Sequence, residues 1–153
     1  MPIQFERPNQ PDVIALIAEL DAYQDTLYPP EARYALDLSS LEQDHVLFAV
    51  ARDADGAAVG CGAVVLEGSS GELKRMFVRP AFRSLGVAAG LLIELEREAA
   101  ARGCAWIQLE TGPRQPAALA FYEKHGYRVC GAFGNYPEHA LSVFMEKRIG
   151  AMG

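Results

Sequence analysis

The chain has 153 residues, of which half are hydrophobic and 22% are charged, and its formal net charge is −6. This length suits one compact domain, so residues 1–153 are expected to share a single apolar core. The acidic balance argues against nucleic-acid binding, which needs a basic face, and no apolar run reaches the roughly 18–20 residues that span a bilayer.

The N-terminal segment and the cysteines indicate the cellular compartment of the protein. No basic stretch followed by an apolar run opens the chain, so no signal peptide is expected. Cys61, Cys104 and Cys130 are odd in number and lie in apolar segments, which favours buried thiols in a reducing compartment. The three histidines make no metal-ligand spacing with them, so no metal site is predicted. We therefore expect a cytoplasmic protein without membrane, nucleic-acid or metal partners.

The first half of the chain predicts a strand, two helical segments and a hairpin, in that order. A strand is expected at residues 3–6, and Pro11 opens a helix whose apolar residues recur at helical spacing. Residues 26–41, with two prolines near their start, predict a loop followed by a short helix. Residues 46–51 and 57–66 have the character of strands, and the turn of Asp and Gly between them predicts a β-hairpin.

The second half alternates strands and helices and ends on two strands. Gly103 and Gly126 mark the ends of the two helices, as glycine commonly does. The whole order predicts an α/β fold with a mixed sheet and helices on its faces. The expected elements are a strand at 71–78, a helix at 85–102, a strand at 106–110, a helix at 116–125, and strands at 127–132 and 141–147.

The turn between the strand at 71–78 and the long helix has the features of an anion site. Pro80 ends the strand because proline cannot donate to a ladder. Gly86 and Ala88 fall in the first helical turn, where backbone N–H groups lack intrahelical partners and small residues let an anion approach. A diphosphate suits this site, and an ordinary turn with solvated arginines is the alternative. Four cations lie close together here: Lys74, Arg75, Arg79 and Arg83.

This turn resembles a known signature. Arg83-x-x-Gly86-x-Ala88 is similar to the Arg/Gln-x-x-Gly-x-Gly/Ala motif of GNAT-type N-acetyltransferases, although Ser84 stands where family members often have glycine. The resemblance implies that backbone amides of the turn hold the pyrophosphate of acetyl-CoA, the acyl donor, and that the preceding strand lies along the pantetheine arm. The cofactor-binding residues that it implies are Met76, Phe77, Val78, Arg83, Ser84, Leu85, Gly86, Val87 and Ala88.

A second motif follows a strand, as it does in that family. The stretch that begins at Gln115 resembles the family's Asn-x-x-Ala-x-x-x-Tyr-x-x-x-Gly-Phe/Tyr element, with Gln115 in place of Asn and the spacing of Ala118, Tyr122, Gly126 and Tyr127 kept. The resemblance implies that the Tyr122 hydroxyl points at the thioester sulfur and acts as general acid toward the leaving thiolate. A core aromatic without a catalytic role is the alternative.

The two motifs together span residues 71–127, over a third of the chain. The resemblance implies a GNAT-like fold with a mixed, mostly antiparallel central sheet and helices on both faces. It also implies that the fourth and fifth strands splay apart and hold the cofactor in the resulting V.

A carboxylate is the expected general base, because an ammonium group must lose a proton before it attacks a thioester. Glu72 is the first candidate, since some family members have a base glutamate at the matching place, although an ion pair with Lys74 would weaken it. A solvated strand-end carboxylate is the alternative for Glu72, and Glu110 on the next strand is the reserve candidate. Strict alternation would place Glu72, Lys74 and Met76 on one face of the strand and Leu73, Arg75 and Phe77 on the other.

The resemblance places acceptor specificity after the first helix and between the last two strands. Tyr28, Glu31 and Tyr136 lie there and suit an ammonium group through cation–π and ionic contacts, while Lys74 or Arg75 would hold an acceptor carboxylate. We therefore expect acetyl transfer to the primary amine of a small molecule, such as an amino acid or a related metabolite. A protein lysine or N-terminal acetyltransferase and a non-catalytic acyl-CoA-binding module remain alternatives. The oligomeric state, including a homodimer, is left open.

Overall fold

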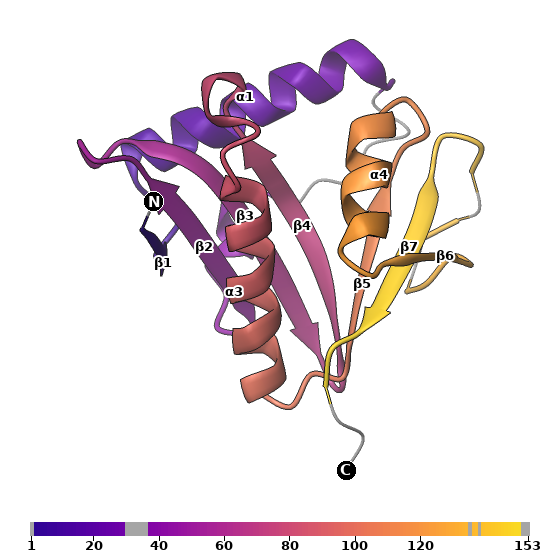
Figure 1. Ribbon diagram of the computed structural model, residues 1–153. Helices are drawn as coiled ribbons and strands as arrows, with labels where there is room; N and C mark the ends of the chain where they lie inside the picture. Colours follow the sequence, from indigo (N-terminus) through magenta and orange to yellow (C-terminus); the bar gives the residue numbers. More distant parts are fainter. Residues whose placement is uncertain (1, 30–36, 135, 138, 151–153) are drawn as a thin grey trace.

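The elements of the chain follow the order that the sequence predicts. A computed structural model describes residues 2–29, 37–134, 136–137 and 139–150. Element ends differ from the predicted ones by a few residues at most, and the first helix runs on to Leu27. The elements are β1 (Ile3–Phe5), α1 (Pro11–Leu27), α2 (Leu38–Leu41), β2 (Val46–Arg52), β3 (Ala58–Glu67), β4 (Ser70–Val78), the 3-10 helix η2 (Pro80–Phe82), α3 (Val87–Ala101), β5 (Trp106–Thr111), α4 (Pro116–Lys124), β6 (Arg128–Cys130) and β7 (Val143–Arg148) (Figure 1).

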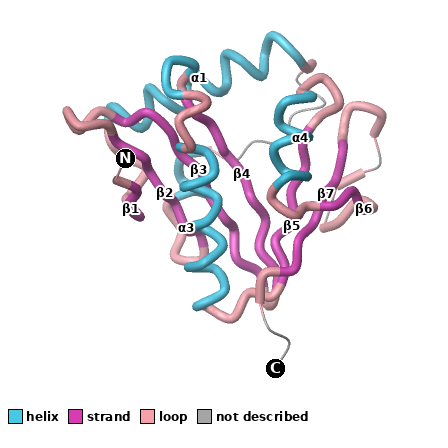
Figure 2. The backbone as a smooth tube through the Cα atoms, viewed as in Figure 1, coloured by secondary structure: helices cyan, strands magenta, loops and turns pink. Residues whose placement is uncertain are grey.

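The strands form one mixed sheet with the order β1-β2-β3-β4-β5-β7-β6 (Figure 2). β2 and β3 pair as the predicted hairpin, and every neighbouring pair is antiparallel except β4 with β5, which run parallel. The predicted fold class, a mostly antiparallel sheet with helices on both faces, is therefore confirmed.

The two parallel strands at the centre of the sheet separate soon after they meet. Residues 70–73 of β4 pair with residues 106–109 of β5, whereas β4 continues to Val78. Figure 1 shows the two strands diverging into a V, as the family resemblance implied. Beyond Leu73, the edge of β4 that faces β5 has no strand partner in the described part of the chain. This part of β4 therefore borders the opening of the V instead of another strand.

A β-bulge in β4 corrects the predicted alternation of side chains. Lys74 pairs with Ala63 and Phe77 pairs with Cys61, so two residues of β4, Arg75 and Met76, oppose Gly62 alone. Arg75 has a φ of 59°, which accommodates the extra residue. Because of the bulge, side chains after it point to the opposite face of the sheet from the one that strict alternation predicts. Leu73 and Met76 consequently pack on the α3 side of the sheet, whereas Phe77 packs on the α1 side.

The helices cover both faces of the sheet. α3 packs in front of β2, β3 and β4 in Figure 1, and α4 packs in front of β5 and β7. α1 and α2 cover the opposite face, where their leucines join buried residues of β2 and β3 in a second core cluster. Within the described residues, no helix is long and apolar enough to cross a membrane.

A polar cluster joins α3 to the C-terminal half of the sheet. Glu96 of α3 accepts a hydrogen bond from the Tyr127 hydroxyl at 2.8 Å and pairs with Lys147 of β7 at 2.9 Å. Tyr127 is almost fully buried, and burial raises the pKa of its phenol. Because α3 packs on β2–β4, this cluster links the two halves of the sheet across the V.

The cysteines only partly follow the prediction of buried thiols. Cys61 and Cys104 are buried, and burial raises the pKa of Cys61 to about 12. Cys130 is half-buried instead, because β6 is a short edge strand that no further strand covers. All three thiols are free.

Candidate active site

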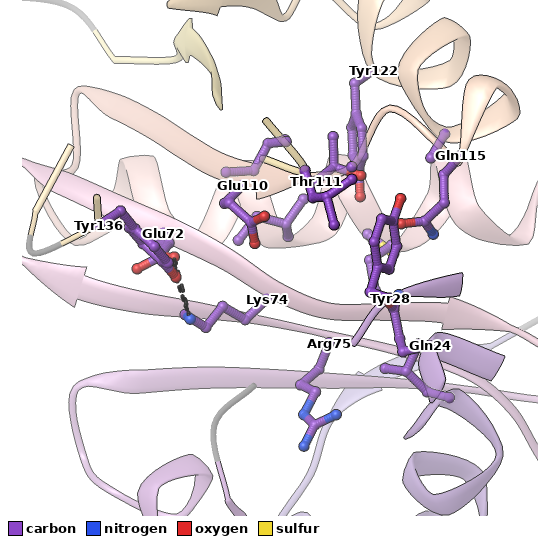
Figure 3. A pocket seen from close by; sticks show the side chains of 17 residues that line it. Gln24, Tyr28, Glu72, Lys74, Arg75, Glu110, Thr111, Gln115, Tyr122 and Tyr136 are labelled. Atoms are coloured by element: carbon purple, nitrogen blue, oxygen red, sulfur yellow. Dashed lines mark hydrogen bonds and ion pairs between the residues drawn. The ribbon is translucent and has the colours of Figure 1, made fainter. Parts of the chain in front are cut away.

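A pocket of about 160 Å³ lies where β4 and β5 part. Figure 3 shows Tyr122, Gln115 and Tyr28 at one end of it, Glu72, Lys74 and Tyr136 at the other, and Glu110 between them. The structure therefore brings together both predicted catalytic residues and the reserve base. It also brings in the predicted acceptor-binding residues Tyr28, Lys74, Arg75 and Tyr136. Glu31, the remaining predicted acceptor residue, lies outside the described residues.

Tyr122 reaches the pocket from the last turn of α4, a helix that begins at Pro116. Its side chain is buried, and its ring makes edge-on contacts with Phe121 and Tyr127 at centroid distances of 5.3 and 5.6 Å. These contacts fix the direction of the ring. Burial raises the pKa of the Tyr122 phenol, so the hydroxyl stays protonated near neutral pH and can donate a proton or a hydrogen bond.

Glu110 reaches the pocket from β5 and is the titratable group best matched to neutral pH. Burial raises the pKa of its carboxyl to about 7, and the charge of Glu72 acts in the same direction. Ser142 and Lys74 oppose this rise. The Ser142 hydroxyl is buried, and no partner in the described chain meets full hydrogen-bond geometry with it. A carboxyl that is half ionised near pH 7 can accept a proton and release it again.

Glu72 lies in the same pocket, but other groups already occupy its carboxylate. The Tyr136 hydroxyl donates a hydrogen bond to it, and the Lys74 ammonium lies 3.4 Å away. Lys74 also donates to the Tyr136 hydroxyl at 2.5 Å and lies 5.2 Å from the centre of its ring. The predicted contact between Lys74 and Glu72 is therefore present. The Glu72 carboxylate is thus held in contacts within the protein, and a substrate amine would have to displace them to reach it.

The predicted cluster of four cations at the phosphate turn needs correction. The Arg79 guanidinium pairs with Glu19 at 2.6 Å, and Arg75 pairs with Asp21 at 2.5 Å. Both partners lie on α1, which presents acidic side chains to the face of β4 that these arginines reach. With Lys74 beside Glu72, three of the four cations are paired within the protein. These three charges consequently stabilise the packing of α1 and the arrangement of the pocket, and they contribute less to the attraction of an anion at the turn.

Arg83 is the cation that stays at the turn. Its Nε donates a hydrogen bond to the Val78 carbonyl at 3.0 Å, and its guanidinium lies within 6 Å of the ring centres of Phe77 and Tyr23. No ion pair of Arg83 is found within the described residues. The side chain thus braces the end of β4 against the turn that follows.

The turn itself contains two residues in the left-handed backbone region. Ser84 and Gly86 both adopt left-handed conformations, with φ of 67° and 79°. The positive φ explains why glycine suits the position of Ser84 in the family signature. Gly86 is the N-cap residue of α3, and no side chain accepts a hydrogen bond from the first helical turn. The N–H groups of that turn therefore point out of the helix without intrahelical partners.

The remaining predicted cofactor residues divide between exposed and buried side chains. Leu85 is 64% exposed, whereas Val87 is buried and anchors the start of α3 in the core. Met76 lines the pocket, and Ala88 packs at the edge of the core. Because the side chains of Phe77 and Val78 are buried in the two core clusters, a ligand can reach these two residues only through their backbone.

Several pocket residues were missed by the sequence analysis. Leu20 and Gln24 line the pocket with Tyr28, and their spacing of four residues, which places them on one face of α1, could have identified them. Gln115 caps α4 without a side-chain hydrogen bond and lines the pocket. Ser142 does not line the pocket but acts on the Glu110 carboxyl. No signal in the sequence marked it, because its approach to Glu110 depends on how the last two strands fold.

The site contains acid and base groups on neighbouring elements. Among the described residues, no group of three or more His, Cys, Asp or Glu side chains could hold a metal ion. What the pocket offers is a protonated phenol, a carboxyl that titrates near neutrality and a stretch of β4 that β5 does not pair with. This combination can bind an amide-bearing chain, take a proton from a nucleophile and donate a hydrogen bond to a leaving group.

Comparisons with known proteins identify the family and the fold of the chain. A model of the Acetyltransferase (GNAT) family matches residues 14–127. The IAA acetyltransferase of Azospirillum brasilense is 45% identical over 147 residues, which cover 95% of each chain. A crystal structure of a Klebsiella pneumoniae protein assigned as an acyl-CoA N-acyltransferase is 42% identical, with a TM-score of 0.86 over 97% of both chains. An aminoglycoside 6'-N-acetyltransferase in complex with coenzyme A shares the fold at 21% identity, with a TM-score of 0.76 over 100% of this chain and 99% of that one.

Proposed function

Because the chain belongs to the GNAT family of acetyltransferases, we propose that it moves an acetyl group from acetyl-CoA to the primary amine of a small molecule, such as an amino acid or a related metabolite. The observation that carries this proposal is the pocket between β4 and β5, which Tyr122 and Glu110 line together. A proton donor and a proton acceptor at one cavity are what amide formation from a thioester needs.

In the proposed reaction, the amine nitrogen forms a bond to the acetyl carbon and the bond from that carbon to sulfur breaks. Glu110, in its ionised form, takes the proton that the ammonium group must lose. Tyr122 donates a hydrogen bond or its proton to the departing sulfur, which would otherwise leave as an unsupported thiolate. The roles are thus divided by environment: burial holds the phenol protonated, while the carboxyl ionises near neutral pH.

The donor would be held mainly by backbone groups. The first turn of α3 offers N–H groups to the pyrophosphate, and the helix dipole adds to the attraction. The pantetheine arm would lie along β4 beyond Leu73, where β5 no longer pairs with it. A neighbour with the same fold was solved with coenzyme A, which supports acetyl-CoA as the cosubstrate here.

The acceptor would enter at the end of the pocket where Lys74 and Tyr136 lie. A cavity of about 160 Å³ suits a small amine better than an extended peptide, which needs an open groove. Lys74 lines this end of the pocket beside Glu72 and would attract an acceptor carboxylate, and the name of the Azospirillum relative also supports a small acceptor. Retention of both Tyr122 and Glu110 favours catalysis over a non-catalytic binding module. A cytoplasmic location and the lack of nucleic-acid partners remain predictions.

A panel of amines tests the proposal. The wild-type protein, with acetyl-CoA, should release free thiol with at least one small primary amine among amino acids, polyamines and aminoglycosides. Activity on lysine peptides alone would replace the proposal with a protein acetyltransferase. Calorimetric binding of coenzyme A without thiol release for any amine would leave only a binding module.

The same assay separates the two candidate bases. Glu110→Gln should lower kcat/KM for the accepted amine by about 10²–10³-fold at pH 7, within the usual range for loss of a general base. Activity should partly recover at high pH, where free amine is available without help. Glu72→Gln should cause a smaller loss that varies little with pH. The reverse order of losses would assign the base to Glu72.

A further inference from the structure

A contact between two distant segments closes the pocket at the end of α1. Tyr28, the C-cap of α1, is buried, and its hydroxyl accepts a hydrogen bond from the backbone N–H of Arg114 at 3.2 Å. The Arg114 side chain returns to α1, where it donates to the carbonyl of Leu27 and lies 5.8 Å from the centre of the Tyr28 ring. We refer to Leu27, Tyr28, Gly112 and Arg114 as the clasp.

Gly112 is the residue that lets the Tyr28 ring take this place. A Cβ atom at position 112 would lie 2.0 Å from the Tyr28 hydroxyl oxygen and 2.3 and 2.7 Å from two ring carbons. These three closest contacts all belong to Tyr28. The φ of Gly112 lies outside the left-handed range, so its backbone does not itself require glycine. The closest obstacle to a side chain there is therefore the Tyr28 ring.

Two residues of the clasp, Tyr28 and Gly112, also line the pocket, so the clasp affects the shape of the cavity. The Tyr28 ring is held from three directions, by the surface of Gly112, the N–H of Arg114 and the guanidinium above it. A ring fixed in this way acts as a rigid wall. Figure 3 shows its hydroxyl directed toward the end of the pocket where Tyr122 and Gln115 lie.

We propose that Gly112 is a positioning residue for acceptor specificity: by seating Tyr28 as a wall of the pocket, it sets the upper size of the amine that can be acetylated. The size limit rests on the proposed function, since it assumes that the acceptor binds in this pocket. The clasp itself does not, because it is a packing relation that can be measured without any substrate.

A double-mutant cycle on stability tests the clasp. Gly112→Ala should lower the thermal unfolding midpoint by several degrees, because the new methyl group collides with the ring. In a Tyr28→Ala background, the same substitution should cause a much smaller loss, because its three closest contacts are gone. Gly131→Ala is the matched control, since a Cβ at position 131 meets nothing within 4 Å and its φ is not left-handed. An equal loss from Gly112→Ala in both backgrounds would overturn the clasp.

Acceptor selectivity tests the size limit. The probes are two pairs of primary amines of different bulk, alanine with tryptophan and ethylamine with tryptamine, each assayed for thiol release with acetyl-CoA. The ratio of kcat/KM for the larger to the smaller amine should rise at least tenfold in both Tyr28→Ala and Gly112→Ala. It should stay within about twofold of wild type in Gly131→Ala.

The two tests separate failure of this inference from failure of the proposed function. An active wild-type protein whose selectivity ratio is unchanged in Gly112→Ala and Tyr28→Ala would overturn the size limit and leave the acetyltransferase function intact. A wild-type protein that acetylates no amine would contradict the proposed function, and the size limit would fall with it. The unfolding cycle would still decide whether Gly112 and Tyr28 depend on each other.

Discussion

Tyr122 and Glu110 titrate unlike surface groups because both lie among side chains that exclude water. Removal from water penalises the charged form of either group, which raises the pKa of the phenol and of the carboxyl together. The chemical result differs between them. The phenol remains a proton donor at every physiological pH, whereas the carboxyl moves into the range where a general base works best.

The role of the Tyr122 hydroxyl can be tested by removing it alone. Tyr122→Phe keeps the ring and its edge-on contacts with Phe121 and Tyr127, so the fold should be preserved. We expect kcat to fall about 10²-fold, the lower end for general acid catalysis, because a thiolate is already a fair leaving group. KM for acetyl-CoA should change little. Steady-state kinetics that retained more than half of wild-type turnover, with chemistry rate-limiting, would exclude the hydroxyl from the reaction.

The sequence identified Glu72 and Glu110 as candidate general bases but could not show which of them is better suited to the role. Both glutamates were found from the sequence, because each lies on a central strand beside a recognised motif. Their surroundings were not accessible, since Tyr136 and Ser142 approach from a distant part of the chain. The proton affinity of a carboxylate depends on such contacts, which no local pattern records.

At the scale of elements, the same limit applies to the cations before the phosphate turn. Their clustering in the sequence predicted an anion site, yet Arg75 and Arg79 pair with α1, more than fifty positions earlier in the chain. The bulge in β4 was likewise hidden, because it is defined by the register against Gly62 of β3. The turn at 83–88 was predicted to within two residues, since Gly86 marks the start of α3 as its N-cap, one residue before the first helical turn in which it was expected. Its role in anion binding stays a prediction.

Two glycines at opposite ends of α3 offer a matched test of that turn. Gly86 and Gly103 both have positive φ, 79° and 89°, and neither has an atom within 4 Å of an added Cβ. Alanine should therefore destabilise the fold by a similar amount at each position, about 1 kcal/mol. Only Gly86→Ala should weaken coenzyme A binding, by at least tenfold in calorimetry, because only Gly86 adjoins the free N–H groups of the first helical turn. Equal affinities in the two variants would show that the pyrophosphate binds elsewhere.

For the molecule as a whole, the order of elements and the class of fold could be predicted from periodicity, turn residues and two motifs. The separation of β4 from β5 was implied by the family resemblance and not by the pattern of the strands themselves. The contacts that shape the pocket across this gap were beyond prediction. Tyr28 meets Gly112 and Glu96 meets Lys147 only after the sheet has formed, so their pairing follows from the fold and not from local sequence.

The proposed general base should also leave a signature in the stability of the whole molecule. The pKa of Glu110 is about 7 in the folded protein, against an ordinary value of 4.5. Between these two pH values the unfolded chain has lost the proton while the folded protein still holds it. The folded state then binds more protons, so the free energy of unfolding falls as pH rises. Below pH 4.5 the contribution is fully present, and above pH 7 it is lost.

Glu110→Gln removes this titration and should make the protein relatively more stable at high pH. At about 1.4 kcal/mol per pH unit, the raised pKa corresponds to roughly 3 kcal/mol, which partial exposure of the side chain reduces to on the order of 1–2 kcal/mol. Urea denaturation from pH 5 to 8.5 should show the difference between variant and wild type growing through this range and levelling off above pH 7. Other carboxylates titrate equally in both proteins and cancel. A constant difference in the free energy of unfolding would mean that Glu110 does not ionise near pH 7 and is unsuited to act as the base. The expected rise in this difference would mean that the ionised carboxylate, which the proposed reaction needs, destabilises the fold that holds it.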